Sequence, residues 1–79
     1  MTQVRVNLNS IEKVKAFVNT IGQFDSEFDL VSGRYVIDAK SIMGIFSLDI
    51  TKPIDLNIHS ETEDELNSIL EAIDMYLAK

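Results

Sequence analysis

Few residues of this chain have side chains that could take part in chemistry. His59 is the only histidine, and the chain contains no cysteine. A histidine can serve as a general base or a nucleophile, but only when a reacting partner lies beside it. His59 follows the alternating run "IDLNI" and precedes Ser60, which predicts a position at the end of a strand. We therefore expect a partly exposed structural histidine rather than a catalytic one.

The acidic residues offer a second possible chemistry, which is metal binding. Asp25, Glu27 and Asp29 alternate along "FDSEFDLV", so they would line one face of a strand. Three carboxylates on an exposed strand would hold a divalent cation only weakly, and the chain has neither an H-x-x-H motif nor a glycine-rich phosphate loop. We interpret both acidic runs, Asp25 to Asp29 and Glu61 to Glu65, as solvent-exposed surface. We expect no metal site and no cofactor.

The stretch "AKSIMGIFSLDI", Ala39 to Ile50, is the most unusual part of the sequence. Ser41 can act as the N-cap of a short helix, because its hydroxyl can accept a hydrogen bond from a backbone N–H two or three residues ahead. Four apolar residues follow within five positions, and on so short a helix they cannot all face one core. They are Ile42, Met43, Ile45 and Phe46. Either the pair Ile42 and Phe46 or the pair Ile45 and Leu48 should pack inward, which leaves open a buried satellite core or a surface for a partner.

Composition limits the classes of partner and of cellular location. The chain has 79 residues, a net charge of −6 and 46% hydrophobic residues, which is enough for one small core without disulfides or zinc. A negative charge of this size argues against binding to nucleic acid or to an anionic membrane surface. No apolar run is long enough to cross a bilayer, and the first residues do not have the pattern of a secretory leader. We expect a cytoplasmic protein with one domain over residues 1–79.

Periodicity predicts seven elements in the order β-α-β-β-(short α)-β-α. Strands are predicted where apolar residues alternate, at Val4–Leu8, Phe24–Val31, Arg34–Lys40 and Ile54–His59, with a tight turn at Ser32–Gly33. A helix is predicted over residues 10–21, capped by Asn9 or Ser10, ended by a left-handed Gly22, and packed through Ile11, Val14, Phe17, Val18 and Ile21.

The last helix is predicted from Ser60, which would form a capping box with Glu63. Its core stripe would be Leu66, Ile69, Leu70, Ile73 and Leu77. Every predicted strand has one polar face, so we expect an antiparallel sheet with helices on one side only, an α+β fold.

Two segments resemble a known family. "KSIMGIFSL", Lys40 to Leu48, is similar to the segment around the regulatory serine of Gram-positive histidine-containing phosphocarrier proteins (HPr), and "EDEL", Glu63 to Leu66, is similar to the start of their last helix. The resemblance implies an open-faced two-layer sandwich with the strand order 1-4-2-3. It also implies that Ser41 is phosphorylated by an ATP-dependent kinase and that Lys40 favours the phosphate. The residues expected to meet protein partners are Lys40, Ile42, Met43, Ile45 and Phe46.

The same resemblance places the phosphoryl-carrying histidine of the family near Ser10. The family has a Gly-Ile-His-Ala-Arg-Pro pattern there, whereas this chain has "LNSIEKVK", without the histidine, the arginine or the proline. A phosphoserine ester is too stable to pass its phosphoryl group onward, and His59 should lie at the opposite end of the sheet. The resemblance therefore implies a regulatory phosphotransferase-system protein that is not an enzyme, with an HPr kinase or a transcriptional regulator as its partner.

Two alternatives remain at the level of the sequence. The chain could be a small-molecule-binding or structural domain of the ferredoxin-like type, whose strand order would be 4-1-3-2. It could also be a phosphocarrier that has lost its activity and is retained inside a larger assembly.

Overall fold

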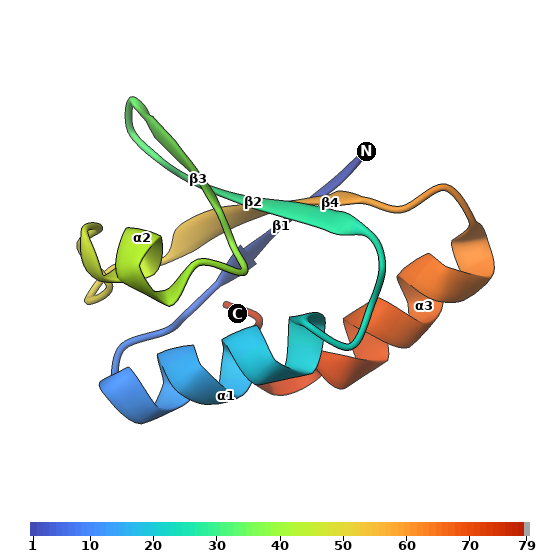
Figure 1. The fold of residues 1–79 in the computed structure, drawn as a ribbon, viewed down its shortest axis with the longest axis horizontal. Coiled ribbons are helices and arrows are strands. Elements are labelled where there is room, and N and C mark those ends of the chain that lie inside the picture. Colours follow the sequence, from blue (N-terminus) through green and yellow to red (C-terminus); the bar gives the residue numbers. More distant parts are fainter. Residues whose placement is uncertain (79) are drawn as a thin grey trace.

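The sequence folds into a four-stranded sheet with a layer of helices beneath it (Figure 1). The computed structural model describes residues 1–78. In chain order its elements are β1 (Thr2–Val6), α1 (Ile11–Ile21), β2 (Glu27–Ser32), β3 (Tyr35–Asp38), α2 (Ile42–Phe46), β4 (Ile54–His59), α3 (Glu63–Ala72) and a short 3₁₀ helix, η1 (Asp74–Tyr76). This order confirms the predicted β-α-β-β-α-β-α sequence of elements.

The strands pair in the order β1-β4-β2-β3, and every pair is antiparallel. Leu56 at the centre of β4 lies opposite Val4 of β1 on one side and Leu30 of β2 on the other. Side chains alternate along each strand, so this register brings the apolar set to one face. The order 1-4-2-3 confirms the predicted sandwich, and the ferredoxin-like alternative is wrong.

The core lies between the sheet and the helices α1 and α3. Its largest fully buried side chains include Phe17 of α1, Phe28 and Leu30 of β2, Leu56 and Ile58 of β4, and Ile69 of α3. The rings of Phe17 and Tyr76 meet edge to face with their centroids 5.5 Å apart, a favourable geometry that ties α1 to η1. The opposite face of the sheet carries polar pairs such as Arg5 with Asp55.

The end of the chain completes the edge of the sheet beside β1. Asn7 N–H donates to the carbonyl of Tyr76 at 2.7 Å, and Ala78 N–H donates to the carbonyl of Arg5 at 2.8 Å. These bonds require an extended backbone at Leu77, so the last helix cannot reach that residue as its apolar spacing predicts. The helix ends at Ala72 because pairing of the following residues with β1 satisfies backbone N–H and C=O groups of that edge strand. A longer helix would leave those groups without partners.

Several predicted helix and turn boundaries differ in the structure. Gly22 follows α1 with φ −63° and is not left-handed. The tight turn of the β2–β3 hairpin has Gly33 and Arg34 at its centre, one residue later than predicted, and Gly33 has φ 60°. Phe24 lies in the turns before β2, which starts at Glu27.

The N-terminus of α3 also differs from the prediction. Thr62, not Ser60, is its N-cap, and the Thr62 hydroxyl accepts a hydrogen bond from Glu65 N–H at 3.2 Å. Ser60 donates to the carbonyl of Thr62 instead, at 3.0 Å. Among the described helices, none has both the length and the apolar character needed to span a membrane.

Candidate functional site

Ser41 lies at the start of α2, as predicted, and acts as its N-cap. Its backbone is extended, with φ −95° and ψ 105°, and its Oγ accepts a hydrogen bond from Gly44 N–H at 3.2 Å. The residue is exposed. A Cβ on Gly44 would lie 3.2 Å from Ser41 Oγ and 3.4 Å from Ile37 Cδ1, so the glycine allows α2 to approach both the capping hydroxyl and strand β3. The serine hydroxyl is thus held in place by one bond and remains open to solvent.

The two sides of α2 have different environments. Ile45 is fully buried and Leu48 nearly so, whereas Met43 is 81% exposed and Phe46 is 38% exposed. This division confirms that one apolar pair packs inward while other apolar residues stay outside. It also corrects the predicted contact patch, since Ile45 belongs to the core and cannot meet a partner. Ile42 is half-buried beside the exposed residues.

The side-chain ammonium of Lys40 binds a distant part of the chain, although Lys40 is adjacent to Ser41 in sequence. Its Nζ donates to the carbonyl of Phe24 at 2.8 Å and lies 5.5 Å from the centre of the Phe28 ring. The long aliphatic part of the side chain allows the ammonium to reach a loop sixteen residues earlier in the chain. The expectation that Lys40 directs its charge to Ser41 is wrong in this structure, because the ammonium is bound to the Phe24 carbonyl.

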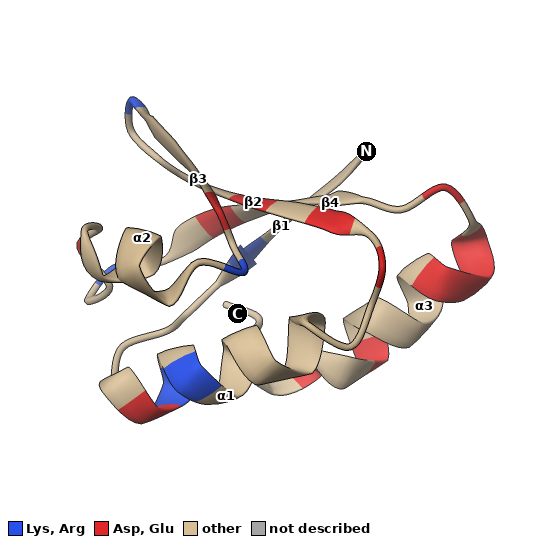
Figure 2. Cartoon of the chain, viewed as in Figure 1, with Lys and Arg blue, Asp and Glu red and all other residues tan. Residues whose placement is uncertain are grey.

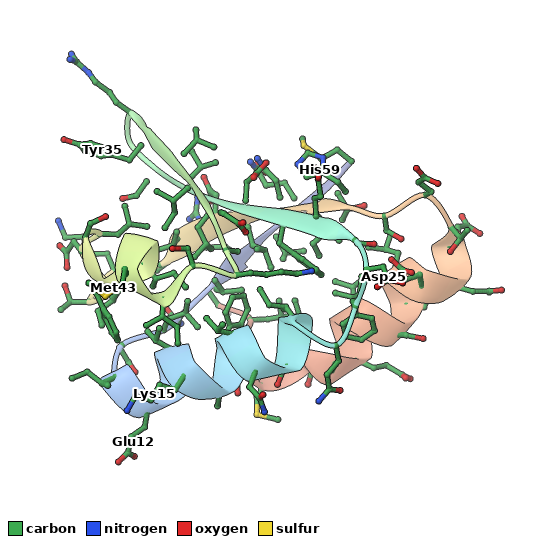
Figure 3. The ribbon with its side chains drawn as sticks, viewed as in Figure 1. Glu12, Lys15, Asp25, Tyr35, Met43 and His59 are labelled. Carbon is green, nitrogen blue, oxygen red and sulfur yellow. The ribbon has the colours of Figure 1, made fainter. Side chains whose placement is uncertain are left out.

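Ser10 occupies an equivalent position at the start of α1. Its Oγ accepts a hydrogen bond from Lys13 N–H at 3.2 Å, the same arrangement and length as at Ser41. The next residue, Ile11, was predicted to face the core but is 58% exposed. Because α1 and α2 pack against each other, both helices contribute exposed apolar side chains to this end of the molecule. Figure 3 shows Met43 on α2 and Lys15 on α1 there.

His59 lies at the other end of the sheet. In the register of the sheet, Val6, the last residue of β1, faces Ile54, while Thr2 faces Ile58, so His59 lies beyond the start of β1 and far from the β1–α1 loop. Its Nε2 is 2.8 Å from Asp29 Oδ2, and the side chain is partly exposed. The histidine is therefore a partly exposed residue at a strand end, as predicted, and the carboxylate is its polar partner.

An acidic pocket that the sequence did not predict lies next to His59. It is lined by Asp25, Ser26, Glu27, His59, Glu61, Thr62 and Glu65, and Figure 2 shows the acidic segments gathered at this end of the molecule. The buried hydroxyl of Ser26 donates to the Glu65 carboxylate, so the loop before β2 is tied to the first turn of α3. These two residues are 39 positions apart, and no local pattern relates them. Within residues 1–78, no group of three or more histidine or acidic side chains has an arrangement that could hold a metal ion.

Comparison with known proteins agrees with this architecture. The fold is similar to that of HPr-C-His from Thermoanaerobacter tengcongensis, with a TM-score of 0.73 and 25% identity over 92% of this chain and 90% of that one. It is also similar to the phosphocarrier protein HPr from Bacillus anthracis str. Ames, with a TM-score of 0.64 and 23% identity over 90% of this chain and 94% of that one. A family model described as the PTS HPr component phosphorylation site matches residues 5–79. This chain therefore belongs to the HPr family of the phosphotransferase system.

Proposed function

We propose that this chain is a cytoplasmic regulatory protein of the sugar phosphotransferase system, which works through protein contacts and is neither an enzyme nor a histidine phosphocarrier. The observation that carries the proposal is the exposed Ser41 hydroxyl at the start of α2, next to exposed Met43 and Phe46. A modifiable hydroxyl beside accessible apolar side chains can change how that surface binds a partner.

The argument against phosphoryl transfer rests on residue types and positions. Ser10 stands where the family resemblance puts the phosphoryl-carrying histidine, and a phosphoserine ester does not pass its group onward readily. His59 is the only imidazole of the chain, and it lies at the opposite end of the sheet against Asp29. A partner enzyme that docks near the start of α1 could not reach it in the same pose.

Phosphorylation of Ser41 is compatible with the local structure. A phosphate there would lie at the N-terminus of α2, where backbone N–H groups of the first turn point outward and the Gly44 N–H is close. The modification would add about −1.5 to −2 charges at pH 7. Because Lys40 is bound to the Phe24 carbonyl, this charge would remain available to the basic side chains of a partner. The contact surface proposed here consists of Ile42, Met43 and Phe46.

The test is incubation of the protein with an HPr kinase and ATP, followed by intact-mass measurement. We expect one added phosphate on the native protein and none on Ser41→Ala. Ser10→Ala is the matched control, since both serines are N-caps with 3.2 Å bonds and both substitutions should cost about 1 kcal/mol of helix stability. The control variant should still be phosphorylated.

Two results would contradict the proposal. One is an unmodified native protein in a tube where a control HPr is phosphorylated. The other is acid-labile phosphate on His59 after incubation with phosphoenolpyruvate and the general enzyme of the system, which would make the chain a phosphocarrier by another route.

A further inference from the structure

Strand β3 forms one edge of the sheet, and part of its backbone has no partner within the sheet. Ala39 N–H donates to the carbonyl of Phe28 at 2.9 Å, so this opposite pair is of the hydrogen-bonded kind. Such pairs alternate along an antiparallel ladder, which makes Ile37 and Tyr35 the other residues that bond to β2. The backbone N–H and C=O of Val36 therefore point to the free edge.

The side chains along this edge are unusually exposed. Tyr35 is 69% exposed and Val36 is 63% exposed, and the tip of the β2–β3 hairpin that carries them points away from helices α1 and α3 (Figure 1). Figure 3 shows the Tyr35 ring near the tip of this hairpin. Val36 lies beside Val31 on the open face of the sheet, so two neighbouring strands contribute apolar side chains there. Exposed apolar side chains on an unpaired strand edge favour pairing with another strand.

Charges on the hairpin are incompletely paired. Asp29 and Asp38 lie directly opposite each other in the β2–β3 ladder, and like charges in this position destabilise a sheet. One Asp38 carboxylate oxygen accepts a hydrogen bond from Lys40 N–H, while the second forms no hydrogen bond or ion pair with residues 1–78. Arg34, at the tip, forms no ion pair within the same part of the chain. The hairpin thus carries one free cation and one free carboxylate oxygen, four residues apart.

We propose that two copies of this chain associate through β3, in an antiparallel pair centred on Val36. In this register Val36 of each copy exchanges two backbone hydrogen bonds with Val36 of the other, and Tyr35 lies opposite Ile37 of the second copy. Arg34 comes next to Asp38 of the second copy at both ends of the pair. The edge is therefore self-complementary in hydrogen bonds, apolar side chains and charge, and the two sheets join into one sheet of eight strands.

The alternative registers are less favourable. A shift by one residue would place the backbone groups of Tyr35, which bond to β2, against those of Val36, and the hydrogen bonds would be lost. A parallel pairing would bring Arg34 next to Arg34 and Asp38 next to Asp38, which like-charge repulsion opposes. The short length of β3 limits the contact area, so we expect association that is weak and strongly dependent on concentration.

Sedimentation equilibrium across a wide range of protein concentration tests the proposal through a charge exchange. Arg34→Glu places acidic groups together at both ends of the pair, and Asp38→Lys places basic groups together, so each variant alone should remain monomeric. An equimolar mixture of the two restores one cation and one anion at both ends, and should associate at least ten-fold more tightly than either variant alone. Added salt should weaken association of the native protein.

Val36→Pro provides a test that does not depend on charge. The proline removes only an N–H that points to the free edge, so the β2–β3 ladder keeps its hydrogen bonds and the circular dichroism spectrum should be unchanged. We expect this variant to be monomeric at concentrations where the native protein associates. A native protein that stays monomeric throughout, association that survives both Val36→Pro and Arg34→Glu, or a mixture that associates no better than its components would each overturn the proposal.

Discussion

Replacement of Ile45 by alanine tests the division of α2 into a buried side and an exposed side. The side chain is fully buried, on a helix of only five residues that packs against α1 and β3. Removing a buried isoleucine side chain down to alanine costs about 2–5 kcal/mol, because the apolar contacts are lost and a cavity remains. The free energy of unfolding of a chain with 79 residues is roughly 4–12 kcal/mol, so the substitution removes a large part of it.

Thermal and urea unfolding followed by circular dichroism measure this loss. A change of 1 kcal/mol shifts the melting temperature of a domain of this size by about 4–8 °C, so Ile45→Ala should lower it by about 10 °C or more. Ile45→Val should cost only about 0.5–1.5 kcal/mol, since it removes one methylene. Met43→Ala, two positions earlier on the same helix, should change stability by no more than about 0.5 kcal/mol because that side chain is exposed.

The three variants together distinguish the observed orientation of α2 from one in which Met43 also packs against the core. If Met43→Ala lowered the melting temperature as much as Ile45→Ala does, α2 would be rotated or sealed against the core. The contact surface of Ile42, Met43 and Phe46 would then not exist. A small loss for Ile45→Ala alone would equally refute the assignment of this residue to the core.

Two further predictions concern hydrogen bonds that the structure locates at loops. Thr62→Ala should lower the free energy of unfolding by about 1 kcal/mol and Ser60→Ala by less, in urea titrations of the two variants, because the Thr62 hydroxyl and not that of Ser60 caps α3. The side chain of Thr51, and then its backbone N–H, hold the pKa of the exposed Asp49 carboxyl below its usual range. Because the pKa of Asp49 is lower in the folded state, its ionised carboxylate stabilises the folded protein at pH values above the pKa of the unfolded chain. This stabilisation disappears as the pH falls through the pKa of the folded state. An NMR titration should show the Asp49 midpoint rise in Thr51→Val, and an unchanged midpoint would contradict the assignment.

The elements with long regular patterns could be predicted from the sequence alone. The alternation of Ile54, Leu56 and Ile58 determined which face of β4 is buried, and the spacing of Val14, Phe17 and Ile21 determined the inner face of α1. Such periodicity reflects the geometry of the element itself, so neighbouring residues contain the information. The same reasoning identified Ser41 as a helix cap and left Asn9 or Ser10 as the other, of which the structure selects Ser10, since a cap bonds to a backbone group three residues away.

Three errors, at Leu77, Lys40 and Ile45, occurred where residues far apart in the chain compete for the same backbone group or the same space. Leu77 continues the apolar stripe of the last helix, which predicted a helical conformation for it. The backbone on either side of Leu77 instead forms hydrogen bonds with the chain at β1, and these require an extended conformation. Lys40 is adjacent to Ser41 in sequence, yet its ammonium binds the Phe24 carbonyl. Ile45 and Met43 are both apolar and two positions apart, and only the position of α2 against the sheet decides which one is buried.

The sequence by itself therefore determined the type and order of the elements and the family resemblance, because these depend on local spacing and on short motifs. The tertiary structure decided which apolar residues of α2 face solvent, which group the Lys40 ammonium binds, and which backbone groups of β3 remain free. These properties depend on the packing of segments that are distant in the chain, and a short-range pattern contains no information about that packing.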